Sequence, residues 1–480
     1  MLEASAKDVT FTYRGSSAPS LTNISITAKP GQVTLLCGGS GSGKTTVLRL
    51  FNGLVPHFHA GELEGSVRIE SQSVPHSNFS ALATSCATVF QNPRTQFYTT
   101  EVKQELAFGS ENLGIEPQII IDRINHVATK LSITPLLPRL VWQLSGGQMQ
   151  RVACAAALCN DTPVIIFDEP TANLSADAID DLANLIAALK ADGHTVIIAE
   201  HRVNFISGLV DDVYCFKAGK IVAHKCGNDF YNMTDAERKE LGLRSLTPVL
   251  IDQQLHVPSQ PKSKGLHIEG LRFEYQRNKP VLDIADLCFP TGKVTALTGT
   301  NGAGKTTLAR IICGLEKAKT GSIKLNGKRF SPKDAYIIMQ DPTRQLFSDT
   351  VRDEVTLGMS KEAKEKVNVK ALLEQLDLAE HQSNHPQSLS GGQRQRLVIA
   401  TALAAHKLVY IFDEPTSGVG YNHLISISQV MRQLADNGAV VIVITHDAEL
   451  INEAADSVVK LDPLPYDGST PKPRLLDRFR

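Results

Sequence analysis

Two glycine-rich segments have the residue types and spacing that bind phosphate. Residues 38–45 (GGSGSGKT) and 299–306 (GTNGAGKT) fit the pattern GxxxxGK[ST], and each follows an apolar run and opens a helical pattern. The glycines let backbone N–H groups converge on phosphate oxygens, and the N-terminus of the following helix adds partial positive charge. Lys44 and Lys305 can neutralise the β- and γ-phosphates of a nucleotide. The chain is therefore predicted to contain two phosphate-binding loops.

An acidic pair ends an apolar run downstream of each loop. The runs are VIIFDE (164–169) and VYIFDE (409–414). A carboxylate at the C-terminal end of a parallel strand faces the same sheet edge as a phosphate loop. The aspartate can hold Mg²⁺ through water, and the glutamate can polarise the water that attacks the γ-phosphate. His201 and His446 end the next apolar runs and can orient that water, although a histidine alone is more often structural.

These motifs occur twice in the same order. Corresponding residues of the two copies are separated by 261 residues at the loop lysine, by 249 at the glutamine of VFQNP and IMQDP, and by 245 at the acidic pair. The difference between 261 and 249 leaves 12 extra residues in the first half, part of them predicted at PHFHAGELEG (56–65). This spacing indicates duplication of whole domains. The predicted organisation is a first domain at 1–242, a linker at 243–265, a second domain at 266–462 and a tail at 463–480.

Apolar runs rich in valine and isoleucine precede the candidate site residues. The runs VTLL, VIIF and TVIIA, then VTAL, LVYIF and AVVIVI, suit central parallel strands covered on both faces. Helical patterns lie between them, as at 177–193, where apolar residues recur at three- and four-residue spacing before a terminal glycine. We predict an α/β fold in each half, with helices flanking a mainly parallel sheet.

The motif LSGGQ separates this chain from many other proteins with phosphate loops. It occurs at 144–148 and at 389–393, each time before a helical pattern. A serine and two glycines at a helix N-terminus make another anion-binding edge. Each half then carries two phosphate-binding edges. The economical explanation is head-to-tail pairing, in which the loop of one half faces the LSGGQ of the other.

These residues resemble the ATP-binding-cassette (ABC) ATPases over nearly all of both halves. An LSGGQ about twenty residues before the Asp-Glu strand is highly specific to that family. The resemblance implies two P-loop cassettes, each with a helical signature subdomain, and hydrolysis of ATP. It also implies two ATP molecules between the cassettes, one held by Lys44 with Ser390 and the other by Lys305 with Ser145.

The motifs and the resemblance give three sets of candidate site residues. The catalytic set is Glu169, Glu414, His201, His446, Gln91 and Gln340. The nucleotide-binding set, with two tyrosines at the position that stacks on adenine, is Tyr13, Gly38, Gly39, Ser40, Gly41, Ser42, Gly43, Lys44, Thr45, Thr46, Ser145, Gly146, Gly147, Gln148, Tyr275, Gly299, Thr300, Asn301, Gly302, Ala303, Gly304, Lys305, Thr306, Thr307, Ser390, Gly391, Gly392 and Gln393. The Mg²⁺ set is Thr45, Gln91, Asp168, Thr306, Gln340 and Asp413. Ser175 and Gly420 stand where the family usually has aspartate, which leaves the coupling between the two sites open.

The segments after the two glutamines resemble the cassettes of energy-coupling-factor importers, which take up vitamins, cobalt or nickel. These segments are residues 90–114 and 339–358, and EHR at 200–202 also fits that group. Gln96 and Gln345 lie in the part that the group uses to contact its transmembrane coupling protein. The resemblance implies two kinds of membrane partner, a coupling protein and a substrate-binding protein. It places the chain at the cytoplasmic face of the cell membrane.

Composition limits the other functions. A net charge of -1 gives no global attraction for nucleic acid, and no run of 18 apolar residues indicates a transmembrane helix. The N-terminal residues do not have the pattern of a secretory signal. Eight cysteines without a CxxC pair predict buried thiols in a reducing cytosol.

Two other kinds of protein share the cassette motifs. A soluble tandem ATPase that acts on ribosomes or nucleic acid typically has a long charged arm, N-terminal cysteines, or coiled-coil or zinc insertions, and this sequence has none of these. Fused sugar importers often have one degraded site, whereas both sites here have their motifs. We therefore predict the ATPase subunit of an importer, with the soluble tandem ATPase as the alternative, and no nucleic-acid partner.

Overall fold

The structure is a computed structural model that describes residues 3–16, 18–171, 174, 176–255, 264–276 and 279–464. These residues form two compact units, one reaching Pro248 and the other starting at Val249. Leu243 and Leu246, in the segment predicted as a linker, are buried in a core of the first unit. Leu255 packs against a core of the second unit. Nearly all of the predicted tail lies outside the described residues.

A six-stranded sheet forms the centre of the first unit, in the order β10-β9-β3-β8-β7-β6. Its strands are β3 (Val33–Gly38), β6 (Cys86–Val89), β7 (Val164–Asp168), β8 (Thr195–Ala199), β9 (Asp212–Lys217) and β10 (Lys220–Cys226). All neighbours are parallel except β10 and β9. Side chains alternate along a strand, so Val196 and Ile198 of β8 enter one apolar core while Ile197 and Ala199 enter another. The sheet is therefore covered on both faces, which explains its uninterrupted apolar runs.

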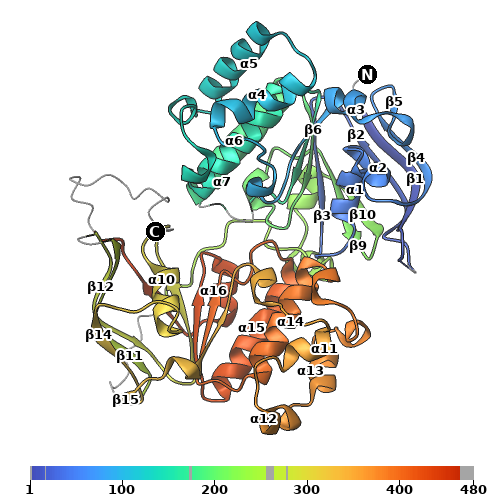
Figure 1. Cartoon of the computed structure of the whole chain (residues 1–480). Helices are drawn as coiled ribbons and strands as arrows, with labels where there is room; N and C mark the ends of the chain where they lie inside the picture. Colours follow the sequence, from blue (N-terminus) through green and yellow to red (C-terminus); the bar gives the residue numbers. More distant parts are fainter. Residues whose placement is uncertain are drawn as a thin grey trace. The chain divides into compact units, whose positions relative to one another are not determined.

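Different elements cover the two faces of this sheet. One face packs against α1 (Lys44–Phe51) and a four-stranded antiparallel sheet, β2-β1-β4-β5. The strands of that sheet are β1 (Ala4–Tyr13), β2 (Leu21–Ala28), β4 (Gly61–Ile69) and β5 (Gln72–Ser73). The other face packs against α6 (Gly146–Cys159), α7 (Ala176–Ala191) and α8 (Gly227–Tyr231). Figure 1 shows α6 and α7 on one side of β3, with α1 and β1 on the other.

A helical subdomain projects from the first unit. It consists of α4 (Val102–Asn112), α5 (Pro117–Lys130) and part of α6. Helix α5 buries Ile120, Ile124 and Val127 at helical spacing, and these residues join an apolar cluster separate from the two sheet cores. The predicted α/β class is confirmed for this unit. The shorter helices are α2 (Leu54–His57), α3 (Phe79–Ser85) and α9 (Asp235–Glu240).

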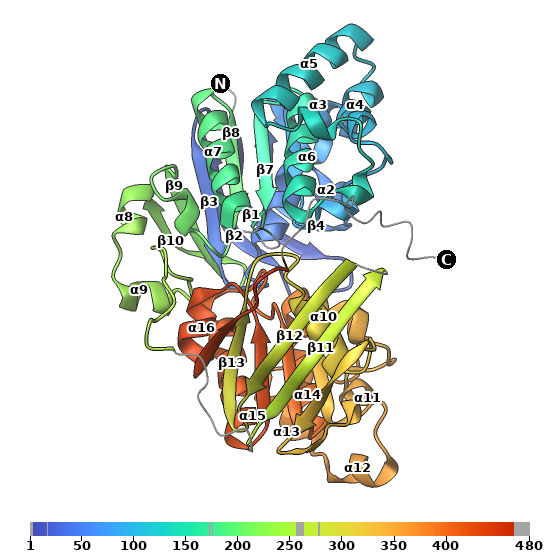
Figure 2. The ribbon, with the colours of Figure 1, turned by 90° about the vertical axis from the view of Figure 1, so that its left-hand side faces the viewer.

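The second unit repeats this plan with a five-stranded parallel sheet, in the order β16-β17-β18-β13-β19. Its strands are β13 (Lys293–Thr298), β16 (Ala335–Ile338), β17 (Val409–Asp413), β18 (Val440–Ile444) and β19 (Ser457–Lys460). The antiparallel sheet contains β11 (Leu266–Gln276), β12 (Lys279–Phe289), β14 (Thr320–Leu325) and β15 (Lys328–Arg329), of which β11 and β12 are labelled in Figure 2. The helices are α10 (Lys305–Ile312), α11 (Val351–Val355), α12 (Lys361–Lys366), α13 (Val369–Gln375), α14 (Gly391–Ala404), α15 (Tyr421–Asp436) and α16 (Ala448–Ala454). The fold class is again as predicted.

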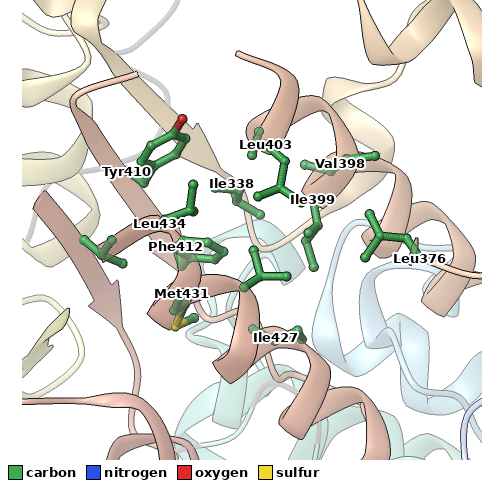
Figure 3. Close-up of a cluster of buried hydrophobic side chains, with 14 of the residues drawn as sticks. Ile338, Leu376, Val398, Ile399, Leu403, Tyr410, Phe412, Ile427, Met431 and Leu434 are labelled. Atoms are coloured by element: carbon green, nitrogen blue, oxygen red, sulfur yellow. The ribbon is translucent and has the colours of Figure 1, made fainter. Parts of the chain in front are cut away.

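The helical subdomain of the second unit is packed differently. Its α11 has 5 residues, against 11 in α4. Its apolar side chains are continuous with one core of the sheet: in Figure 3, Ile399 and Ile338 lie between Leu376 and Val398 on one side and Phe412 on the other. The subdomain and the sheet of this unit therefore share one core.

The extra residues of the first unit fall in two places. In the first unit, β5 begins 28 residues after the loop lysine and β6 begins 42 residues after it. In the second unit, the corresponding strands β15 and β16 begin 23 and 30 residues after the loop lysine. Five extra residues therefore precede β5, in the region predicted to hold part of the insertion. The other seven lie between β5 and β6, where α3 forms. Across the described ranges, no helix has both the length and the apolar character needed to cross a membrane.

Candidate functional site

The phosphate loop of each unit joins a parallel strand to a helix. In the first unit β3 ends at Gly38 and α1 begins at Lys44, and in the second α10 begins at Lys305 after β13. Gly38 and Gly299 have φ angles of 142° and 139°. A Cβ at either position would overlap a backbone carbonyl of the adjacent segment, so only glycine fits. The two loops therefore start with the same backbone geometry.

Lys44 and Lys305 are buried inside their loops. Lys44 Nζ donates hydrogen bonds to the carbonyl oxygens of Gly38 at 3.0 Å and Gly39 at 3.1 Å. Lys305 makes the same two contacts at 2.6 and 3.1 Å. Burial lowers the pKa of both lysines, and the acidic residues at the sheet edge oppose that shift. Each ammonium group is placed to exchange these carbonyls for phosphate oxygens.

The acidic pair of the first unit lies at the edge where the loop begins. Thr45 Oγ1 donates to Asp168 Oδ1 over 3.2 Å. Gln91 Nε2 donates to Glu169 Oε2 over 2.7 Å, and His201 Nε2 lies 3.1 Å from Glu169 Oε1. The amide and the imidazole therefore hold the Glu169 carboxylate through different oxygens. Side chains that follow three different strands meet at one place, as their positions at parallel strand ends predict.

The two carboxyl groups of this edge differ in acidity. Burial raises the pKa of Asp168 to about 6, and the adjacent charge of Glu169 adds to the shift. Burial also opposes ionisation of Glu169, but His201 and Lys44 more than offset it, so the pKa of Glu169 is lowered. Burial likewise raises the pKa of Asp413 in the second unit. At neutral pH, Glu169 is ionised and can accept a proton from water.

Glu169 and Glu414 both have a left-handed backbone, with φ angles of 45° and 47°. A non-glycine residue rarely adopts this conformation, which costs about 1–3 kcal/mol and persists only where the surroundings fix it. The N–H of Glu169 donates to the carbonyl of Ala199, and that of Glu414 to the carbonyl of Ile444, each over 2.8 Å. The neighbouring strand therefore holds both glutamates in the same strained conformation.

A threonine hydroxyl contacts the glutamate of the second unit. Glu414 Oε2 accepts a hydrogen bond from Thr445 Oγ1 over 3.2 Å. His446 and Gln340 follow the neighbouring strands, and their side chains are exposed. His201, by contrast, is buried. The two edges thus have the same predicted residue types in different surroundings.

Two carboxylates that the motif analysis did not single out lie behind these edges. Glu200 accepts hydrogen bonds from Thr171 in the first unit, and Asp447 accepts one from Thr416 in the second. All four side chains are buried. The sequence signal for them was the contrast between EHR and THD around the two histidines.

Each LSGGQ serine begins a helix. Ser145 Oγ accepts the N–H of Gln148 over 3.3 Å, and Gln148 Oε1 accepts the N–H of Ser145 over 3.0 Å. Ser390 and Gln393 form the same reciprocal cap at 3.3 and 2.8 Å. Both serines are exposed at the starts of α6 and α14. The helix start that is predicted to bind an anion therefore has the same capped geometry in each unit.

The two tyrosines predicted to stack on adenine are each tethered to the helix after the phosphate loop. Tyr13 Oη lies 3.1 Å from Thr46 Oγ1 and accepts a hydrogen bond from Arg49 over 3.3 Å. Tyr275 Oη lies 3.3 Å from Thr307 Oγ1. These contacts fix each ring relative to its phosphate loop.

The glutamines predicted to lie in the partner-contacting segments turn back into their own loops. Gln96 Oε1 accepts the N–H of Phe90 over 3.0 Å, and Gln345 Oε1 accepts the N–H of Met339 over 2.7 Å. Their side chains shape the loop. Beside them, Tyr98 is 80% exposed and Phe347 is 74% exposed.

A buried glutamate fixes the backbone at each of these aromatic residues. Glu105 Oε2 accepts the N–H groups of Tyr98 and Thr99 over 3.0 and 2.8 Å. Glu354 Oε2 accepts those of Phe347 and Ser348 over 2.7 and 2.6 Å. Sequence analysis missed this pair, although the two glutamates recur 249 residues apart, as the preceding glutamines do.

The departure from the family pattern is only partly visible. Ser175 lies outside the described residues. Gly420 caps the N-terminus of α15 in an extended conformation, with φ −76° and ψ 174°. Without a side chain, it offers only its backbone for contact.

Comparison with known proteins places these features in a family. The model of the ABC transporter family matches residues 21–172 and 282–417. A Treponema denticola protein, provisionally named an ABC transporter ATP-binding protein, is 37% identical over 463 residues, covering 95% of this chain and 94% of that protein. A Bacillus subtilis protein, provisionally named the HMP/thiamine import ATP-binding protein YkoD, is 30% identical over 496 residues, covering 96% and 91%.

Among solved structures, an archaeal ribosome recycling factor, aABCE1, in complex with the ribosomal stalk protein aP1, matches with a TM-score of 0.62. The match covers 94% of this chain and 87% of that chain at 20% identity. It shows a shared fold.

Proposed function

This chain belongs to the ABC transporter family and is an ATPase, and on that premise we propose that it energises an importer of the energy-coupling-factor type. The observation that carries the proposal is a feature present in both units. Each displays an exposed aromatic residue, Tyr98 or Phe347, on a loop whose backbone is fixed by a buried glutamate. A fixed, solvent-facing aromatic side chain suits docking to another protein.

The first site has the groups needed to activate water. Glu169 is ionised at neutral pH and accepts the proton of the water that attacks the γ-phosphate. Gln91 and His201 hold its carboxylate, and Lys44 balances the charge of the outer phosphates. The strained backbone of Glu169 keeps the carboxylate directed to this edge.

The oxygen donors at this edge fit Mg²⁺. Thr45 Oγ1 and Asp168 Oδ1 lie 3.2 Å apart beside the phosphate loop, and hydroxyl and carboxylate oxygens are ligands that this ion prefers. Thr45, Asp168 and the amide oxygen of Gln91 would hold it, as Thr306, Asp413 and Gln340 would in the second unit. The ion supplies charge neutralisation of the phosphates.

We further propose that each ATP is shared between the units, by Lys44 with Ser390 and by Lys305 with Ser145. The support is that each unit has its phosphate loop and a separate exposed, capped helix start at its LSGGQ. A helix start with exposed serine and glycine offers N–H and hydroxyl donors to a phosphate. The intact motifs of both units support two active sites per chain.

Two features support import and a vitamin-type substrate. A relative that matches over nearly its whole length is named for HMP/thiamine import. Both units retain the phosphate-loop lysine, the acidic pair and the histidine, whereas fused sugar importers often have one degraded site. The membrane partners are a coupling protein, docked at the loops that carry Tyr98 and Phe347, and a protein that selects the substrate. The chain then lies at the cytoplasmic face of the membrane.

Affinity purification of the chain from detergent-solubilised membranes tests this proposal. Wild-type chain should recover integral membrane proteins, and Tyr98→Ala/Phe347→Ala should lose most of them while binding ATP normally. Phe58→Ala is the matched control, because Phe58 is also 74% exposed but lies outside those loops. Recovery of ribosomes without an integral membrane protein, or full retention of the membrane proteins by the double variant, would contradict the proposal.

A further inference from the structure

A buried carboxylate stands behind the water-activating glutamate in each unit, but it comes from opposite sides of the histidine. In the first unit it is Glu200, the residue before His201. In the second it is Asp447, the residue after His446. The offset of 245 residues pairs Glu200 with Thr445 and pairs Arg202 with Asp447. The two units therefore place the carboxylate at different sequence positions.

Glu200 connects two segments of the first site. It is 2% exposed. Its Oε1 accepts the N–H of Thr171 over 3.1 Å and also the Thr171 hydroxyl. Its Oε2 accepts the N–H of His201 over 2.6 Å. One carboxylate thus ties the segment just after Glu169 to the segment that carries the imidazole.

Asp447 makes the corresponding connection in the second site. It is 4% exposed, and its Oδ2 accepts the Thr416 hydroxyl over 2.6 Å. Its own N–H donates to Thr445 Oγ1 over 3.1 Å, and that hydroxyl donates to Glu414 over 3.2 Å. The carboxylate again holds the threonine two residues after the water-activating glutamate. Thr445, which takes the place of Glu200 before the histidine, donates its hydroxyl to Glu414.

We propose that Glu200 and Asp447 are equivalent positioning residues for ATP hydrolysis. The carboxylate precedes the histidine in the first cassette and follows it in the second. Each fixes the threonine, Thr171 or Thr416, that follows the strained glutamate, and so keeps the glutamate and the histidine in register. This inference rests on the proposed roles of Glu169 and Glu414. It adds that Glu-His-Arg and Thr-His-Asp are two solutions to one structural requirement.

The physical reason lies in the strain at the glutamates. A left-handed conformation at Glu169 or Glu414 persists only if the chain on both sides is held. The neighbouring strand holds the N–H of the glutamate, and the buried carboxylate holds the threonine two residues later. A buried acceptor with several hydrogen bonds is well suited to this, because breaking it leaves buried donors without partners.

A transplant of one arrangement into the other cassette tests the inference. In a Glu414→Gln background, single-turnover ATP cleavage reports on the first site. Glu200→Thr should slow cleavage about 10-fold to 100-fold, the range found when supporting hydrogen bonds around a site are removed. Its ATP dissociation constant should change less than about threefold, because the phosphate loop is untouched. Glu200→Thr/Arg202→Asp, which builds the second cassette's arrangement, should restore cleavage to within about threefold of the background.

Three controls make the outcomes separable. Arg202→Asp alone keeps Glu200 and controls for loss of the arginine. Thermal unfolding of every variant shows whether slow cleavage reflects a loss of fold. If it does, the unfolding temperature should fall together with the cleavage rate. Lys44→Ala tests the proposed site itself.

If Lys44→Ala has no effect, the proposed function of the site fails. If Lys44→Ala abolishes cleavage while Glu200→Thr cleaves at the background rate, only the positioning role is overturned. A folded double variant as slow as Glu200→Thr would overturn the equivalence of the two arrangements.

Discussion

The two cassettes have the same chemical groups and different supports for them. In the first, Glu169, which we propose activates water, is held by Gln91 and by the buried His201. In the second, Glu414 receives the hydroxyl of Thr445, and His446 is exposed. The repeat keeps the residues that we propose to face phosphate and water, while the residues behind them differ. The two sites should therefore respond differently to the same substitution.

Replacing both water-activating glutamates should have the largest effect. Glu169→Gln/Glu414→Gln removes both proton acceptors, so steady-state ATP turnover should fall by about 100-fold or more, the lower end of what general bases contribute. The single variants show how the sites are coupled, since independent sites leave about half the turnover and coupled sites leave almost none. Near wild-type turnover in the double variant would show that neither glutamate has the assigned role.

The histidines offer the sharpest contrast between the cassettes. His201→Ala should slow ATP cleavage by about 10-fold to 100-fold, because Glu169 loses a hydrogen-bond partner. Without that imidazole, the effect of burial dominates and the pKa of Glu169 rises. As pH falls, the variant should therefore lose activity at a higher pH than wild type does.

Single-turnover rates between pH 5 and 8 measure this, in chains with the other site silenced. His446→Ala should cause a smaller loss and a smaller shift, since a contact of an exposed imidazole is weaker than one of a buried imidazole, and Glu414 keeps the bond from Thr445. Equal losses and shifts at the two sites would remove the proposed difference.

Asp168 should make the first unit less stable as pH rises. Its pKa is raised to about 6 by burial, so the native chain binds this proton more tightly than the unfolded chain does. The proton on Asp168 stabilises the native chain fully below about pH 4, and this stabilisation is lost as pH rises through about 6. The free energy of unfolding should fall by up to about 3 kcal/mol, since each unit of pKa shift corresponds to about 1.36 kcal/mol. Asp168→Asn removes this dependence.

Denaturant unfolding without nucleotide and with EDTA, at pH 4.5 and 7, measures the change. Asp413→Asn provides the matched comparison, because burial raises the pKa of Asp413 as well. Identical pH dependence in wild type and Asp168→Asn would contradict this assignment.

The tyrosine hydroxyls should have the smallest effects. Tyr13→Phe removes a hydroxyl that contacts Thr46 and Arg49, so the ring is held less firmly and ATP binding at the first site should weaken by at most about 1 kcal/mol, roughly the contribution of one hydrogen bond. Tyr13→Ala also removes the ring and should weaken binding by about 1–3 kcal/mol. Equilibrium binding of a fluorescent ATP analogue measures both, with Tyr275→Phe and Tyr275→Ala as the matched pair. A larger loss for phenylalanine than for alanine would exclude stacking.

Sequence reasoning could reach the candidate site residues at the sheet edge because local spacing determines their positions. A loop between a strand and a helix brings Lys44 to the sheet edge, and parallel strand ends bring Asp168 and His201 to the same edge. The α/β class followed from the apolar runs in the same way. These features depend on short segments whose period and composition are visible in the sequence.

The supporting residues depend on tertiary packing and were not predictable in this way. Glu105 and Glu354 look like ordinary helix residues until the fold brings the preceding loop over them. Gln96 lies in a segment expected to contact a partner, and only the fold shows that its side chain binds its own loop and that the exposed group beside it is Tyr98. Only comparison of the two halves, position by position, gave a signal for such residues.

The most direct test of two working cassettes is the number of ATP molecules bound per chain. The Glu169→Gln/Glu414→Gln chain, purified with its membrane partners, is incubated with Mg²⁺ and radiolabelled ATP, and bound nucleotide is counted by equilibrium dialysis. We predict two ATP per chain, falling to about one when Lys44 or Lys305 alone is replaced by alanine, since each lysine serves one site. The contradicting result is one ATP per chain before any lysine is replaced, and no further loss when one of the two lysines becomes alanine. Only one cassette would then bind ATP.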